Sequence, residues 1–139
     1  MGAYENAKKF FHACESAAGW EGCKEYVADN ASFHAQSEPL VEVTTIEAYC
    51  DWLAGFGTVT APNATYHLHH QSYDEGSRTA AFFGTYQATH TGEGGPVPPT
   101  GKETKSHYVY IVTMGDDEKV ASMTKIWNSG WAMVELGWA

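Results

Sequence analysis

Two long runs of strand-forming residues, separated by a connection rich in proline and glycine, constrain this chain most strongly. Residues 78–90 and 103–114 are rich in aromatic and β-branched side chains, which favour pleated and partly buried strands. The connection, residues 91–102, contains three prolines and four glycines and therefore cannot be helical. Because a hairpin needs only about two residues to turn, a connection of this length indicates a segment that carries function or closes over something.

The rest of the chain predicts helices on one face of a sheet. Helical periodicity predicts helices over residues 4–18, 20–28 and 44–56, the last beginning with a capping box of Thr44 and Glu47. Strands are predicted over residues 31–36, 60–73 and 119–128, and residues 131–138 are expected to form a closing tail. This order predicts one α+β domain, residues 1–139, with a curved antiparallel sheet wrapped around a long helix and a blind cavity between them.

The composition excludes several classes of partner. A net charge of −9 with only 8 Lys and Arg residues disfavours nucleic acid and anionic membranes, which need a basic face. No apolar run is long enough to span a bilayer, and no signal peptide is recognisable. Cys14, Cys23 and Cys50 show no Cys-x-x-Cys spacing, and reduced thiols in a cytoplasmic protein are the simplest interpretation. Nucleotide-binding and nucleophile-elbow motifs are absent, so no cofactor is expected.

The connection and the end of the chain carry a family resemblance. Thr89-His90-Thr91-Gly92 followed by Pro98-Pro99-Thr100-Gly101-Lys102 resembles the loop of the SnoaL-like polyketide cyclases. Lys125-Ile126-Trp127-Asn128 and Glu135-Leu136-Gly137 resemble the closing strand and tail of that family. The family belongs to the nuclear-transport-factor-like superfamily, so the resemblance implies a cone-shaped α+β barrel and a homodimer formed through the outer face of the sheet.

The resemblance also places a candidate catalytic residue at Asn128. In the family an acidic residue that serves as the acid/base stands at this position, judged from its distance to Leu136-Gly137. An amide cannot take up and return a proton, but it can donate a hydrogen bond to a carbonyl or enolate oxygen. The plain structural alternative is that Asn128 caps the tail that follows it.

Histidines are the candidates for the missing acid/base. Pairing the last two strands through an even-length turn puts His107 opposite Ile126 and on the same face as Asn128. A one-residue bulge would reverse that face, and residues of the other face would then line the cavity: Tyr108, Tyr110, Met123 and Trp127. His34 is a second candidate by resemblance, because the family often has a polar pocket residue in this strand. Exposure to solvent is the alternative for both histidines.

The run from Tyr66 to Gln71 places His67 and His69 on one face of a strand. A polar strand face is the favoured interpretation of this run, and the alternative is that His67 or His69 reaches the pocket and binds substrate. Without three or four converging ligands, a metal site is not expected there. Five aromatic residues are further candidates to bind a flat, apolar ligand, although most aromatic residues of a small domain form plain core. They are Tyr49, Trp52, Phe56, Phe82 and Trp127.

Two functions remain open at the level of the sequence. The first is a cofactor-independent cyclase, isomerase or dehydratase that acts on a small polyketide-like or terpenoid-like carbonyl compound. In it His107, with His34 or His67/His69, moves protons and Asn128 holds the oxyanion. The second is a non-catalytic small-molecule-binding or dimerisation module of the same fold. A polar pair inside the cavity favours the enzyme, whereas an interior filled by side chains favours the module.

Overall fold

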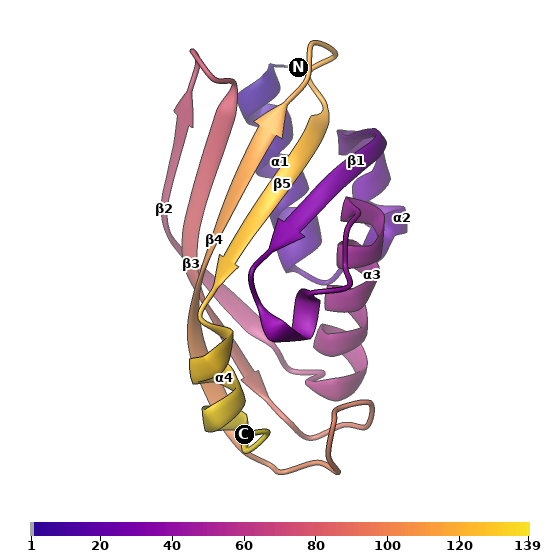
Figure 1. The fold of residues 1–139 in the computed structure, drawn as a ribbon, viewed down its shortest axis with the longest axis vertical. Helices are drawn as coiled ribbons and strands as arrows, with labels where there is room; N and C mark the ends of the chain where they lie inside the picture. Colours follow the sequence, from indigo (N-terminus) through magenta and orange to yellow (C-terminus); the bar gives the residue numbers. More distant parts are fainter. Residues whose placement is uncertain (1) are drawn as a thin grey trace.

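The computed structural model describes residues 2–139 and shows helices packed against one face of a long, curved sheet (Figure 1). The main helices are α1 (Ala3–Glu15), α2 (Gly19–Cys23), α3 (Ile46–Gly55) and α4 (Ser129–Leu136). Two 3-10 turns, Lys24–Tyr26 and Glu38–Leu40, and a π-helical turn, Phe56–Thr60, join them to the rest of the fold. The helix α4 covers the end of the molecule opposite the N-terminus (Figure 1).

The sheet contains five strands in the order β1-β5-β4-β3-β2. Their bounds are β1 (Val27–Ala35), β2 (Thr65–Asp74), β3 (Thr79–Thr89), β4 (Glu103–Met114) and β5 (Val120–Trp127). The last four strands form an antiparallel meander, and β1 joins its edge parallel to β5. The predicted fold class is therefore confirmed, although β1 begins four residues earlier than predicted and β2 five residues later.

An aromatic core joins α1 to the sheet. The helical stripe of α1 buries Phe10 and Phe11 completely. The ring of Phe11 stacks on that of Phe82 with centroids 4.6 Å apart, and it meets the ring of Tyr110 edge-on at 5.0 Å. Such pairs add about 0.5–1.5 kcal/mol each to the burial of their apolar area. This packing makes the even-numbered residues of β4 the inner ones.

The pairing of β4 with β5 decides which residues face the helices. Met114 pairs with Val120 around a five-residue turn, residues 115–119, and the register then shifts by one more residue at Ala121. Tyr108 consequently pairs with Trp127, so the predicted pairing of His107 with Ile126 is wrong by two residues. A shift of two residues leaves each side chain on its original face. His107 and Asn128 therefore lie on the same face of the sheet, as predicted, but this face is the outer one.

Thr45, and not Thr44 as predicted, is the N-cap of α3, and its hydroxyl accepts a hydrogen bond from the backbone N–H of Ala48.

The connection between β3 and β4 closes over the end of α3. After the π-helical turn, the backbone N–H of Gly92 donates to the carbonyl oxygen of Thr60 at 2.9 Å. A Cβ atom at Gly92 would overlap the carbonyl group of Val59, so this close approach requires glycine.

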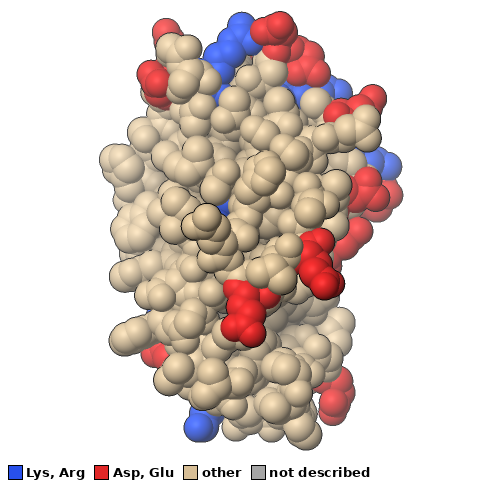
Figure 2. All heavy atoms as spheres, in the orientation of Figure 1, with Lys and Arg blue, Asp and Glu red and all other residues tan. Residues whose placement is uncertain are grey.

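Charged residues lie mainly at the upper end and along one edge of the face seen in Figure 2, and most of that face is uncharged. None of the helices within residues 2–139 is long and apolar enough to cross a membrane.

Candidate functional site

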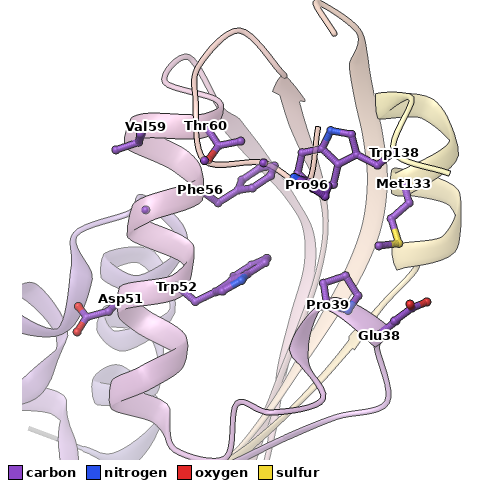
Figure 3. A pocket seen from close by; sticks show the side chains of 13 residues that line it. Glu38, Pro39, Asp51, Trp52, Phe56, Val59, Thr60, Pro96, Met133 and Trp138 are labelled. Carbon is purple, nitrogen blue, oxygen red and sulfur yellow. The ribbon is translucent and has the colours of Figure 1, made fainter. Parts of the chain in front are cut away.

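A cavity of about 630 Å³ opens at the end of the molecule that α4 and the 91–102 connection enclose. Trp52 and Phe56 project from α3 and its π-helical extension towards Met133 and Trp138 of the C-terminal segment (Figure 3). Pro39 and Pro96 complete the apolar wall, whereas the carboxylate of Asp51 points away from the open space (Figure 3). The size and lining suit a small, largely apolar ligand.

Aromatic rings shape this cavity. The rings of Trp52 and Phe56 are nearly parallel, with centroids 5.9 Å apart, and Trp138 meets Phe56 edge-on at 5.9 Å. Flat, rigid surfaces of this kind favour flat ligands, since a stacked ring gains contact area without ordering flexible side chains.

The indole of Trp138 fixes the tail to the 91–102 connection. Its Nε1–H donates to Nδ1 of His90 at 2.9 Å, and the backbone N–H of Thr100 approaches the same nitrogen at 3.4 Å. The His90 side chain is fully buried, and its Nε2 has no hydrogen-bond partner within residues 2–139. Because Nδ1 accepts, Nε2 carries the proton in the neutral ring. His90 thus holds the tail against the 91–102 connection.

Trp52 and Phe56 separate the large cavity from a second, very narrow space of about 10 Å³ in the interior. Both rings line both spaces. On the far side of these rings the polar side chains of Ser106 and Lys125 face the narrow space, together with the indole of Trp127. The Nε1–H of Trp127 donates to the hydroxyl of Ser106 at 3.0 Å, which leaves the hydroxyl proton of Ser106 available to another acceptor.

Lys125 begins a chain of buried hydrogen bonds. Its Nζ donates to the hydroxyl of Tyr49 at 2.6 Å, and this hydroxyl lies 3.1 Å from that of Tyr110. The Tyr110 hydroxyl donates to Oε1 of Glu15 at 2.6 Å. All four side chains are buried. The ammonium also lies 5.0 Å from the centre of a Trp127 ring, so aromatic faces provide much of its remaining environment.

Burial shifts the pKa values of this chain of groups towards their neutral forms. It lowers the pKa of Lys125, an effect that the charge of Glu15 partly opposes. Burial likewise raises the pKa of Glu15, against the charge of Lys125 and a hydrogen bond from Tyr110. Burial and the charge of Glu15 raise the pKa of Tyr49, which therefore stays protonated at neutral pH. Lys125 is thus a buried amine whose pKa is lowered and whose hydrogen-bond partner, the hydroxyl of Tyr49, keeps its own proton.

His107 and Asn128 lie together, but outside the interior. Both are exposed, and with Lys105 and Trp131 they line a small outer pocket of about 190 Å³. The backbone N–H of Asn128 donates to the carbonyl oxygen of His107 at 3.0 Å. Asn128 occupies the N-cap position of α4, yet its side chain makes no capping hydrogen bond. The expectation that this pair faces the interior cavity is therefore wrong, because the aromatic residues of β4 take the inner face.

The other three candidate histidines are also exposed. His34 pairs with Thr124 at the junction of β1 and β5. His67 and His69 lie on β2 with ring centres 4.8 Å apart, and Nε2 of His69 lies 2.8 Å from the hydroxyl oxygen of Thr85. Neither the large cavity nor the narrow space includes any of the three, so their predicted access to the pocket is not observed.

The predicted aromatic residues divide between cavity and core. Trp52 and Phe56 line both spaces, and Trp127 lines the narrow one, as predicted by the alternative face assignment. Tyr49 contacts the interior through its hydrogen bond to Lys125. Phe82 is fully buried against Phe11 and lines neither space, so its predicted role in substrate binding is not supported by its position.

Glu15, Ser106 and Lys125 bring polar groups into the interior, and none of the three was predicted from the sequence. One signal was available. Lys125 alternates with Met123 and Trp127, and those two were expected inside if the face were reversed. The same alternation places Lys125 on the inner face as well.

The fold defines a class of protein, the cone-shaped α+β domains that enclose a cavity between sheet and helices. The model of the SnoaL-like domain matches residues 7–123, and the chain belongs to this family. The resemblance in the 89–102 loop is thereby confirmed. No curated protein matches the sequence.

Solved structures share the fold across nearly the whole chain. AclR, a putative hydroxylase from Streptomyces galilaeus, is 22% identical with a TM-score of 0.70, and the match covers 96% of this chain and 87% of AclR. IdmH, a putative polyketide cyclase from Streptomyces antibioticus, is 17% identical with a TM-score of 0.74 and 99% coverage of both chains. An NTF2-like protein from Burkholderia thailandensis E264 is 12% identical, with a TM-score of 0.75 and 97% coverage of both. The homodimer and the cytoplasmic location stay predictions.

Proposed function

We propose that this protein is a cofactor-independent acid/base enzyme that acts on a small, flat, apolar carbonyl compound, with Lys125 as the group that moves the proton. The reaction class is abstraction of a proton next to a carbonyl, as in cyclisation, isomerisation or loss of water. The observation that carries the proposal is the position of Lys125, buried and bordering the narrow space behind Trp52 and Phe56.

The chemistry of Lys125 fits this role. Its amine form accepts a proton from carbon, and burial makes that form accessible by lowering the pKa of Lys125. The hydrogen bond with Tyr49 holds Nζ in place, and the hydroxyls of Tyr49 and Tyr110 link it to Glu15. A proton taken by Lys125 is therefore stabilised electrostatically by Glu15 through two hydroxyl groups.

Ser106 supplies the complementary donor. Its buried hydroxyl accepts from Trp127 and retains its own proton for a carbonyl or enolate oxygen. A hydrogen bond that strengthens as the oxygen gains negative charge accelerates enolisation. Lys125 and Ser106 face the same narrow space, as a base and an oxyanion donor must.

The substrate must displace Trp52 or Phe56 to reach this pair. The large cavity offers a binding place on one side of the two rings, and Lys125 lies on the other. Rotation of these half-buried aromatic side chains would join the two spaces. Motions of this kind commonly complete a catalytic site when the substrate binds.

Hydrogen–deuterium exchange at a carbon next to a carbonyl tests the proposal without knowledge of the natural substrate. The bicyclic ketone 2-tetralone is incubated with the protein in deuterated buffer, and loss of its α-proton signals is followed by NMR. We expect exchange above the buffer rate for the native protein and a rate near that of buffer for Lys125→Met. The exposed residue Lys105 provides the matched control, since Lys105→Met should leave the acceleration unchanged. Equal acceleration by Lys125→Met would contradict the proposed role.

A second candidate function is a small-molecule-binding module without catalysis. The specific observation in its favour is that side chains fill the interior around Lys125 almost completely, leaving about 10 Å³. The exchange experiment, together with a measurement of ketone binding, separates the two functions. Saturable quenching of tryptophan fluorescence by ketones, with no Lys125-dependent exchange for any member of a panel of mono- and diketones, supports the binding module.

A further inference from the structure

Three cysteines that are far apart in the sequence converge between the helices. Cys14 lies on α1, Cys23 ends α2 and Cys50 lies on α3. Their Sγ atoms all lie within 4.8 Å of one another, and those of Cys14 and Cys50 are 3.7 Å apart. All three side chains are at most 1% exposed. The sequence spacing gave no sign of this cluster, because each thiol comes from a different helix.

The triangle has the dimensions of a metal–thiolate site. An ion at the centre of an equilateral triangle of sulfurs with edges of 3.7 Å or 4.8 Å would lie about 2.1 Å or 2.8 Å from each sulfur, and the usual metal–thiolate distance of about 2.3 Å falls between these values. Occupation therefore needs only small movements of the three side chains, with the helices in place.

The number of ligands selects the metal. Within residues 2–139 no further histidine, cysteine or carboxylate joins the cluster, so it offers three sulfurs and no fourth protein ligand. Structural zinc requires four ligands, and a site this buried has no ready place for a water molecule in the fourth position. Soft thiolates favour Cu(I), which accepts three sulfur ligands and carries a single charge into the apolar interior.

We propose that Cys14, Cys23 and Cys50 bind one Cu(I) ion in three-coordinate geometry. The ion enters already reduced, so binding involves no electron transfer. Each thiol that becomes a thiolate ligand releases one proton to solvent, and a single thiolate suffices to balance the charge of the ion. The sequence-based expectation was that the chain binds no metal, and the proposal departs from it.

The short helix α2 provides a route for the ion. Cys23 lies at its end, and positive φ angles occur at Ala17 (66°) in the preceding turn and at Gly19 (74°), the first residue of α2. A five-residue helix on such a turn has few hydrogen bonds of its own and can open locally without unfolding the sheet.

Anaerobic competition with the Cu(I) chelator bicinchoninate tests the proposal. We expect the native protein to withdraw one equivalent of Cu(I) from the chelator and Cys23→Ser to bind more than about 100-fold more weakly. Met123, a buried sulfur outside the cluster, provides the matched control, and Met123→Leu should bind as the native protein does. Retention of all Cu(I) by the chelator, unchanged binding by Cys23→Ser, or tighter binding of Zn(II) than of Cu(I) would each overturn the proposal.

A measurement on the native protein keeps the test decisive if the cysteine variants fail to fold. X-ray absorption of the Cu(I)-loaded protein should show three sulfur ligands at about 2.3 Å and no nitrogen or oxygen ligand. The thermal midpoint of the native protein should rise when Cu(I) is added, because the ion binds only the folded arrangement of the three helices. Two sulfur ligands, or coordination by nitrogen, would place the ion elsewhere and refute the assignment.

Discussion

Nζ of Lys125 lies 2.6 Å from the phenolic oxygen of Tyr49, and both side chains are buried between the sheet and α3. Lysine is rarely buried so fully unless it is paired. Here the negative partner, Glu15, is reached only through the hydroxyls of Tyr49 and Tyr110. The fold thus holds an ionisable lysine in its interior at a position where an apolar residue would pack more simply, which supports the proposed role of Lys125.

The pH dependence of stability should reveal the lowered pKa of Lys125. Below its folded-state pKa, Lys125 is charged in both states and its desolvation cost is fully present. Between that value and its unfolded value of about 10.5, only the unfolded chain holds the proton, so stability rises with pH. Urea unfolding at a series of pH values approaching 10.5 should therefore show the native protein gaining free energy of unfolding relative to Lys125→Met as the pH rises.

Glu15 supplies the control for this pH effect. Its charge opposes the lowering of the pKa of Lys125, so Glu15→Gln should lower that pKa further. The rise in stability should then begin at a lower pH in Glu15→Gln than in the native chain. The tyrosines that face Lys125 stay protonated in this range because burial raises their pKa values. Parallel stability curves for the native protein and Lys125→Met would show that Lys125 has an ordinary pKa.

Replacement of Tyr49 by Phe should weaken both the fold and the proposed reaction. The hydroxyl of Tyr49 is the hydrogen-bond partner of Lys125 and a neighbour of the Tyr110 hydroxyl, so its removal leaves buried polar atoms without a partner. We expect a loss of about 1–3 kcal/mol in the free energy of unfolding, measured by urea denaturation. In the matched variant Tyr110→Phe the contact between Lys125 and Tyr49 survives, so ketone exchange should fall less than in Tyr49→Phe. The reverse order would show that the link to Glu15 matters more than the position of Nζ.

His107→Ala and Asn128→Ala should have little effect. Both side chains are exposed on the outer face, where substitutions usually change stability by no more than about 0.5 kcal/mol. Ketone exchange should also be unchanged, because neither residue borders the large cavity or the narrow space. A tenfold loss of exchange in either variant would instead place the chemistry in the outer pocket that these residues share with Lys105 and Trp131.

The sequence predicted the architecture well because its strongest signals are local. The β-branched and aromatic runs, the proline-rich connection and the helical stripes each depend on neighbouring residues, and together they allow few α+β arrangements. The boundaries were less accurate. Thr45 replaced Thr44 as the helix cap because capping depends on backbone dihedral angles that adjacent threonines do not distinguish.

The site could not be predicted as reliably because it depends on which face of β4 is buried. His107 and Tyr108 are neighbours, and both faces of the strand contain apolar side chains. Only the packing of Phe11 against Tyr110 and Phe82 decides between them, and these contacts join residues 99 and 71 positions apart in the sequence. The cysteine cluster has the same origin, since no spacing in the sequence indicates that three helices bring single thiols together.

The hydrogen bond between Trp138 and His90 should control access to the cavity. Trp138→Phe preserves an aromatic ring against Phe56 but removes the N–H that donates to Nδ1 of the buried His90, at a cost of about 1–2 kcal/mol in the free energy of unfolding. Trp138→Ala also removes part of the cavity wall, so it should bind 2-tetralone about tenfold more weakly than Trp138→Phe, as measured by quenching of tryptophan fluorescence. The exposed Trp131 of α4 is the matched control, and Trp131→Ala should change neither quantity appreciably. If Trp138→Ala binds the ketone as tightly as the native protein does, the ligand does not occupy the space that Trp138 encloses. The proposed route from the large cavity past Phe56 to Lys125 is then contradicted.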